Sequence, residues 1–163
     1  MTWKERYKKI YEEYSISRYP AATKDFGVLP VKYPKVTSAN GLSTLTENVF
    51  NWQGHHMERT SNMGRPADKR KTYVDVIGRI RVIGSIEWQK GTGTKGTSDL
   101  KGEFKSKNHA YPIPLKVEVK YGKDRQSEPQ KEYQKKVTSI GAIYWIVSYP
   151  EDVFELYDYL MTL

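Results

Sequence analysis

The stretch "LKVEVKYGKD", Leu115–Asp124, contains the clearest β-strand pattern in the chain. Its first six residues alternate strictly, with apolar side chains on one face and Lys116, Glu118 and Lys120 on the other. Glu118 and Lys120 are therefore separated by about 6.6 Å along the strand, at roughly 3.3 Å per residue. A carboxylate and an ammonium group at this spacing can serve a single site.

A second acidic residue precedes another short strand pattern. In "GTSDLKGEF", Gly96–Phe104, Asp99 follows a glycine-rich loop and begins the predicted strand. If the two strands pair, the Asp99 and Glu118 carboxylates approach each other and repel unless a cation lies between them. Carboxylate oxygens suit Mg²⁺, which is usually held by one or two carboxylates with water and substrate phosphate. An isolated Glu-x-Lys is also common on the solvent-exposed face of a sheet. A metal site and an exposed charged face are therefore both open interpretations at this point.

Local patterns predict the other elements of the chain. Apolar periodicity indicates helices over residues 3–14, 43–53, 127–141 and 148–163. Residues 72–89 resemble a β-hairpin around Gly78, residues 15–41 are expected to be extended, and the apolar run 142–147 is typical of a central strand covered on both faces. This order predicts an α/β fold with a central mixed β-sheet flanked by helices.

Three helix starts carry capping signals. Ser43 or Thr44 can cap the second helix, and Ser148 with Glu151 can form a capping box before the last one. Ser127 and Gln130 form the best-marked capping box. Gln130 has two interpretations, because the same side chain could also hold a water molecule or a phosphate.

The composition favours a polyanionic partner. The 163 residues suit one domain, and 27 basic against 19 acidic residues give a net charge of +8. Nucleic acid is the first candidate partner and an anionic membrane surface the second. The candidate phosphate contacts are Arg65, Lys69, Arg70, Lys71, Arg79, Arg81, Lys95, Lys123 and Arg125.

Several other classes are disfavoured. The chain has no cysteine, and no apolar run is long enough for a membrane span or has the form of a signal peptide, so we expect a cytoplasmic protein without membrane partners. "GTGTKGTS" is not a phosphate-binding loop of the Walker type, because Lys95 precedes Gly96. The histidines, His55, His56 and His109, have no recognisable metal-binding spacing.

Taken together, these motifs resemble the PD-(D/E)xK nuclease superfamily, and more narrowly its VRR-NUC branch, small versions of which occur in phages. The resemblance rests on Gly96–Asp99, on Glu118–Lys120, and on Gly122, Asp124 and the capped helix at Ser127 with its Gln130. Element order extends it to residues 44–147. Ser98 stands where the family frequently has Pro, and residues 1–43 have no counterpart in it.

The resemblance implies a restriction-endonuclease-like core in residues 44–163, preceded by an N-terminal helix and Pro-containing extended arm in residues 1–43. It implies Mg²⁺ or Mn²⁺ bound by Asp99, Glu118, the Val119 carbonyl and Glu47, with Lys120 assisting catalysis. Gln130 is a further candidate at this site.

The expected function is divalent-metal-dependent endonucleolytic hydrolysis of DNA that leaves 5′-phosphate and 3′-hydroxyl ends, with junctions and flaps among the candidate substrates. If a phage encodes the chain, the expected location is the host cytoplasm. A homodimer through the N-terminal helix and arm is a further expectation. The alternative is a non-catalytic, basic nucleic-acid-binding protein with a degenerate nuclease fold.

Overall fold

The computed structural model describes residues 1–60, 64–89, 91 and 93–163. Residues 1–60 and 95–163 form one compact unit, called the body here, and the described residues between 61 and 94 form a second. The predicted boundary at residue 43 does not coincide with this division, because the helix at the N-terminus packs inside the body.

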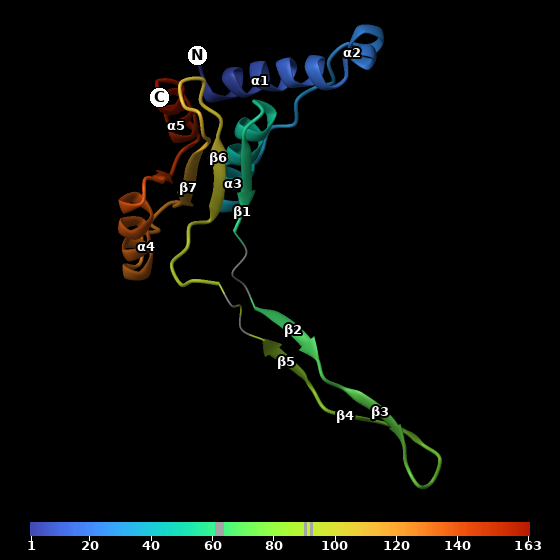
Figure 1. The fold of residues 1–163 in the computed structure, drawn as a ribbon. Helices are drawn as coiled ribbons and strands as arrows, with labels where there is room; N and C mark the ends of the chain where they lie inside the picture. The colour runs from blue at the N-terminus through green and yellow to red at the C-terminus, as the bar shows by residue number, and fades with distance from the viewer. Residues whose placement is uncertain (61–63, 90, 92) are drawn as a thin grey trace. The chain divides into compact units, whose positions relative to one another are not determined.

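The body is built on a four-stranded mixed sheet (Figure 1). Its strand order is β1 (His56–Arg59), β6 (Leu100–Phe104), β7 (Ile113–Val119) and β8 (Ile143–Val147). The first three strands pair antiparallel, and β8 runs parallel to β7. The predicted central mixed sheet flanked by helices is confirmed.

Three helices enclose the main core on one face of this sheet: two of them pack on the strands, and the N-terminal helix packs on those two helices. They are α1 (Trp3–Arg18), α3 (Ala39–Trp52) and α5 (Pro150–Met161). The inward residues of β7, Leu115, Val117 and Val119, belong to this core because strand side chains alternate. Burial of these apolar side chains is the dominant stabilising contribution.

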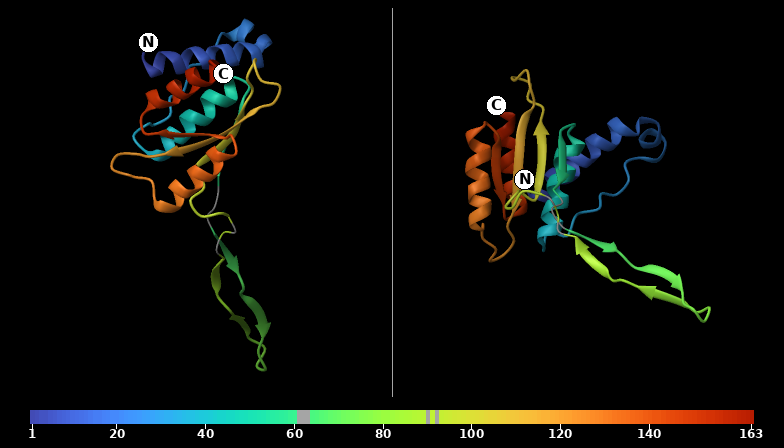
Figure 2. Two further views of the ribbon diagram at one scale, coloured as in Figure 1. Left: turned by 60° about the vertical axis from the view of Figure 1, so that its left-hand side comes forward. Right: turned by 60° about the horizontal axis from the view of Figure 1, so that its bottom comes forward.

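The opposite face of the sheet carries α4 (Glu128–Ser139), as Figure 2 shows. Val137 of this helix, Ala142 and Tyr144 form a small cluster of their own, with Tyr133 packed against it. The capping box of Ser127 and Gln130 is present at its start. Of the β7 residues on this face, Glu118 is buried, Lys116 is half-buried and Pro114 is exposed.

Four local predictions were wrong. Residues 15–18 continue α1, and a short helix, α2 (Pro20–Phe26), interrupts the segment expected to be extended. Helix α3 begins earlier than predicted, with Ser38 as its cap. Strand β8 is covered by α4 and α5 on its two faces, as predicted, but it lies at the edge of the sheet and not at its centre. Tyr149 and Asp152, one residue later than predicted, cap α5.

The second unit contains a two-stranded antiparallel ribbon, residues 64–89. The predicted hairpin is confirmed in β3 (Lys71–Val74) and β4 (Ile80–Ile83), and β2 (Arg65–Asp68) pairs with β5 (Ile86–Gln89). Strand β2 lies where a loop was predicted. The Asp75 carboxylate accepts hydrogen bonds from the backbone of Ile77 and Arg79, at 3.0 and 2.9 Å, and so closes the turn.

Among the described residues, no helix has the length and apolar character needed to cross a lipid bilayer.

Candidate active site

The central feature of the site is a glutamate that is completely enclosed in the body. Glu118 of β7 has 0% exposure, on the sheet face that α4 covers. One carboxylate oxygen accepts a hydrogen bond from the Gln130 side-chain amide and lies 2.9 Å from the Lys120 ammonium. The other accepts from the Tyr144 hydroxyl at 3.1 Å. The burial is thus compensated by three donors, as a buried carboxylate requires.

Lys120 is held by three acceptors at the end of β7. Besides Glu118, its ammonium donates to the Gln130 side-chain oxygen at 3.1 Å and to the Asp124 carboxylate at 3.2 Å. Burial opposes the charge, but the hydrogen bonds and charges of Glu118 and Asp124 outweigh it and raise the lysine pKa. Lys120 is therefore a charged, fixed ammonium group in the neutral pH range.

Asp99 lies beside this pair, as predicted. Because β6 and β7 pair antiparallel with Leu100 opposite Val117, Asp99 precedes β6 at the level of Glu118. Its carboxylate accepts a hydrogen bond from the Val119 backbone amide at 2.8 Å. This contact fixes a second carboxylate at the strand segment that carries Glu118 and Lys120.

Two effects raise the pKa of Glu118. Burial disfavours its charged form most strongly, and the nearby Asp99 charge adds to this, although Lys120 and Tyr144 act in the opposite direction. Carboxylates in this arrangement favour a neighbouring cation. Burial and the Glu118 charge also raise the pKa of Tyr144, whose hydroxyl stays protonated and available as a donor.

The glycine-rich loop before Asp99 approaches α4 closely. Gly96 has φ +75°, and a Cβ added there would lie 2.2 Å from the Pro129 carbonyl oxygen, so only glycine fits without displacement. The buried Ser98 hydroxyl donates to the Leu100 carbonyl at 2.8 Å. The loop is thereby held against the first turn of α4, the turn that contains Gln130.

Gln130 combines capping with a contact to the site. Its side-chain oxygen accepts from the Ser127 backbone amide at 2.9 Å, and the same oxygen accepts from Lys120 at 3.1 Å. Its amide nitrogen donates to Glu118. The capping interpretation is confirmed, and the side chain also orients both Glu118 and Lys120.

Glu47 is engaged elsewhere. This half-buried α3 residue accepts a hydrogen bond from the Arg59 guanidinium at 2.8 Å, and Arg59 also donates to Thr44 at 2.7 Å. Within the described part of the chain, no hydrogen bond joins Glu47 to the residues that hold Asp99 or Glu118. Its role in metal binding stays a prediction.

The predicted DNA-contacting residues divide between the two units. Lys95, Lys123 and Arg125 are exposed on the body, and the backbone amide of Arg125 donates to Asp124 at 2.9 Å. The other six lie in the ribbon, where Lys69, Arg70 and Arg81 form ion pairs. Within residues 64–89, no ion pair joins Arg65, Lys71 or Arg79 to an acidic side chain.

Sequence reasoning missed Tyr144 as part of the site. It lies in the apolar run that became β8, and the parallel register places it opposite Lys116, on the face of β7 that also carries Glu118. A hydroxyl within an otherwise apolar strand was the available signal.

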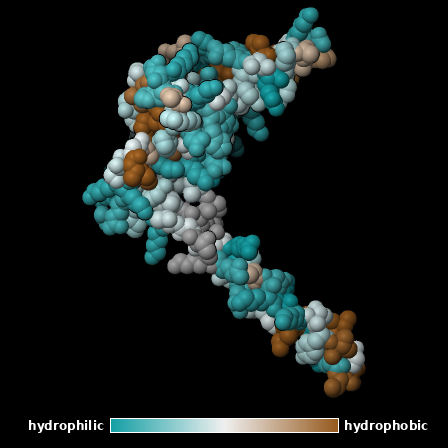
Figure 3. Space-filling model, viewed as in Figure 1, coloured by the Kyte–Doolittle hydropathy of each residue, from teal (hydrophilic) through white to brown (hydrophobic). Residues whose placement is uncertain are grey.

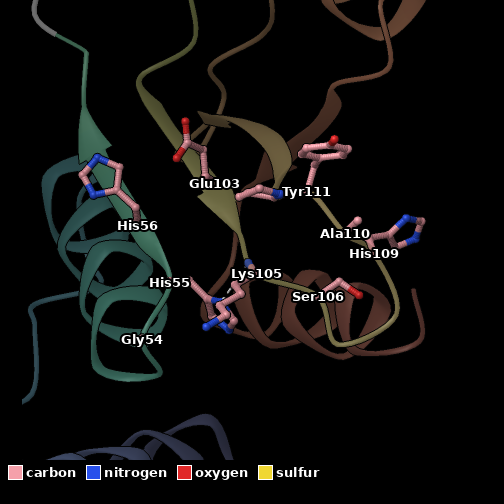
Figure 4. Close-up of a pocket in the computed structure, with 10 residues that line it drawn as sticks. Gly54, His55, His56, Glu103, Lys105, Ser106, His109, Ala110 and Tyr111 are labelled. Atoms are coloured by element: carbon pink, nitrogen blue, oxygen red, sulfur yellow. Dashed lines mark hydrogen bonds between the residues drawn. The ribbon is translucent and has the colours of Figure 1, made fainter.

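The histidines occupy a separate hollow of about 330 Å³ (Figure 4). His55 stacks on Phe104, with ring centroids 4.0 Å apart, and its Nδ1 accepts from the Lys105 amide at 3.2 Å. Burial lowers its pKa. His56 and His109 lie at separate places around the hollow in Figure 4. In the described part of the chain, no group of three or more His, Asp or Glu side chains is gathered as a metal site.

The oxygen atoms of Asp99 and Glu118 fit a hard divalent cation in their chemistry, since Mg²⁺ is commonly held by one or two carboxylates with water and phosphate as the remaining ligands. In comparisons with known proteins, no family model, no curated protein and no solved structure matches the chain.

Proposed function

We propose that the chain is a divalent-metal-dependent DNA endonuclease of the PD-(D/E)xK type, similar to the VRR-NUC branch. The observation that carries this proposal is the enclosed Glu118, paired with Lys120 at 2.9 Å beside the Asp99 carboxylate. Burial of charged groups is costly, and functional sites are where proteins retain it. A solvated strand face, the competing interpretation of the Glu-x-Lys motif, does not bury its glutamate.

The arrangement of elements supports the same proposal. Helix α3 and the antiparallel strands β1, β6 and β7 are followed by α4 and the parallel strand β8. We infer that this order and mixed sheet represent a restriction-endonuclease-like core. The ribbon is then an insertion between its first two strands.

In this proposal Asp99, Glu118 and the Val119 carbonyl hold Mg²⁺ or Mn²⁺, with Glu47 as a further candidate ligand. The bound ion supplies Lewis-acid activation of the phosphodiester and a water molecule of lowered pKa. Side chains of the protein orient the reactants and stabilise the developing charge. The Lys120 ammonium orients the attacking water and offsets negative charge that develops on the phosphate oxygens.

Gln130 and Tyr144 are positioning residues. Both donate to Glu118, and Gln130 also accepts from Lys120, so they fix the carboxylate and the ammonium relative to each other. Fixed polar groups stabilise a transition state without reorganising during the reaction.

Exposed basic residues suit DNA as the substrate. With a net charge of +8, the chain gains affinity for a phosphate backbone through counterion release. Lys95, Lys123 and Arg125 are exposed, belong to loops next to Asp99 and Lys120 in the sequence, and would bring phosphate toward the acidic pair. A homodimer through α1 stays a prediction, although Tyr7 of its apolar stripe is already buried within the chain.

The test is cleavage of labelled duplex, single-stranded, flap and four-way DNA in Mg²⁺, Mn²⁺ or EDTA. We expect metal-dependent cleavage of at least one substrate, with 5′-phosphate products. Glu118→Gln should lower the rate at least ~10³-fold, whereas Glu132→Gln, at an exposed position on α4, should leave it unchanged.

DNA binding without cleavage of any substrate in either metal would instead support the non-catalytic nucleic-acid-binding alternative.

A further inference from the structure

The ribbon exposes a row of large apolar side chains. Figure 3 shows hydrophobic residues gathered toward its turn. The exposed apolar residues between 64 and 89 are Tyr73, Val74, Val76, Ile77, Ile80, Val82, Ile83, Ile86 and Trp88. A two-stranded hairpin has no core of its own and is only marginally stable in water, so a ribbon of this composition requires a partner surface.

The pairing register sorts these side chains onto two faces. Directly opposed residues of an antiparallel pair project to the same side. The outer half of the ribbon is the β3–β4 pair, and the inner half is the β2–β5 pair. In the outer half, Val74 opposes Ile80 and Thr72 opposes Val82, which gives one face four uncharged side chains. The other face of the same half carries Lys71, Ile83, Tyr73 and Arg81.

The inner half of the ribbon continues the same two faces, although its even-numbered face also carries Asp68, opposite Ile86. Both halves share one register, from Arg65 opposite Gln89 to Val74 opposite Ile80, without an inserted residue. Among the inner residues, Trp88 and Ile86 lie on the face of even-numbered positions, as do the four uncharged residues of the outer half. The even-numbered positions thus carry most of the apolar groups.

We propose that this uncharged face, defined by Thr72, Val74, Ile80 and Val82, docks on the same face of a second copy of the chain. Two such ribbons can stack as the two layers of a β-sandwich, about 10 Å apart. Contact between identical patches is the geometry of a closed two-fold dimer.

The absence of charge on this face favours a second copy of the chain over DNA as its partner. The face has no charged group in its outer half, so two copies meet there without repulsion despite the net charge of +8. Lys71 then points away from the contact and remains available to phosphates, and Arg81, which is paired with Asp75, lies on the same face as Lys71. DNA bound to that basic face would leave the uncharged face in water, so DNA binding does not account for it.

Sedimentation velocity of the full chain over a range of concentrations tests the proposal. The face is small beside the ~800 Å² per partner of a standard interface, so we expect a dimer with a dissociation constant on the order of 10 µM. Val82→Lys buries a charge at the contact and should raise the dissociation constant at least ~10-fold.

The matched control is the next residue of the same strand. Val82 and Ile83 are equally exposed, at 63% and 62%, but lie on opposite faces. Ile83→Lys should therefore change the dissociation constant less than about twofold. The milder substitutions Val82→Thr and Ile83→Thr keep β-branched side chains and so preserve the strand structure of the ribbon. Val82→Thr should again raise the dissociation constant more than Ile83→Thr does, by a smaller factor.

A monomer at every concentration up to about 200 µM, well above the expected constant, would overturn the proposal, and so would equal weakening by Val82→Lys and Ile83→Lys. In a chain that stays monomeric, weaker duplex binding by Val82→Thr than by Ile83→Thr would identify DNA as the occupant instead. These measurements require no cleavage, so their outcome is independent of the proposed nuclease activity.

Discussion

The body and the ribbon depart from ordinary folding rules in opposite ways. The body encloses the charged pair of Glu118 and Lys120, with 0% and 9% exposure, between a strand and a helix. The ribbon exposes Val, Ile and Trp side chains that a self-sufficient structure would bury. Buried charge and exposed apolar surface are the two informative exceptions to the rule that apolar groups lie inside.

The two departures indicate how each unit interacts with molecules outside the chain. Within the body, three donors compensate for the burial of the Glu118 carboxylate. The nearby Asp99 carboxylate adds negative charge that a cation can neutralise. The ribbon cannot bury its own apolar side chains, because a two-stranded sheet has no second layer to cover them. We therefore expect chemistry in the body and macromolecular contact in the ribbon.

The largest effect is expected for Lys120→Met. The substitution removes the ammonium group from the proposed site and should lower the cleavage rate about 10²- to 10³-fold. It also leaves Glu118 buried without its cation, which should lower the free energy of unfolding by about 3 kcal/mol. Single-turnover cleavage and thermal unfolding measure the two effects. Lys116→Met, on the same face of β7, is the control, and equal losses in both variants would contradict the assigned role.

Replacing residues 64–89 by a short Gly-Ser linker tests whether the units are separable. The body should unfold at nearly the same temperature, because its core contains no ribbon residue. The ribbon has six basic and three acidic residues, so the variant should lose duplex affinity roughly tenfold or more, with a salt dependence weaker by about three counterions. An unfolded body would show that the body depends on the ribbon for stability, and unchanged duplex binding in fluorescence anisotropy would show that the ribbon does not contact DNA.

A smaller effect is expected for Tyr144→Phe. Loss of the hydroxyl donor leaves one oxygen of buried Glu118 without its partner, which costs about 1 kcal/mol and should slow cleavage no more than about tenfold. Tyr133→Phe, in the same small cluster, should change neither quantity. A full loss of activity in Tyr144→Phe would mean that the hydroxyl takes part in the chemistry.

The smallest effect concerns pH. A raised pKa means that folded Glu118 holds its proton more tightly than the unfolded chain does, so its contribution to stability is complete below pH 4.5 and is lost as pH rises through the folded value. In EDTA, the wild type should lose stability relative to Glu118→Gln across that window. Thermal unfolding from pH 4 to 8 measures the difference. A relative gain in stability as pH rises would show that the carboxylate is stabilised in its charged form.

The sequence predicted those parts of the body that depend on neighbouring residues. Strict alternation located β7 and placed Glu118 and Lys120 on one face, and the capping box located the start of α4. Both signals arise from side-chain direction and local hydrogen bonding, which are properties of a few consecutive residues.

Features that depend on distant residues were not predictable in this way. Nothing near Tyr144 indicates that its hydroxyl meets Glu118, and the pairing of Glu47 with Arg59 follows from α3 packing beside β1. The edge position of β8 follows from strand order, which local patterns do not encode. The division of the ribbon into an uncharged and a basic face likewise required the register of its strands.

We propose that Asp99 and Glu118 together bind a divalent cation, and titration with Mn²⁺ followed by electron paramagnetic resonance tests this without any knowledge of the substrate. The wild type should bind Mn²⁺, Glu118→Gln and Asp99→Asn should each weaken binding at least ~10-fold, and the exposed Glu132→Gln should bind as the wild type does. Equal Mn²⁺ affinity in the wild type and both site variants would contradict the claim.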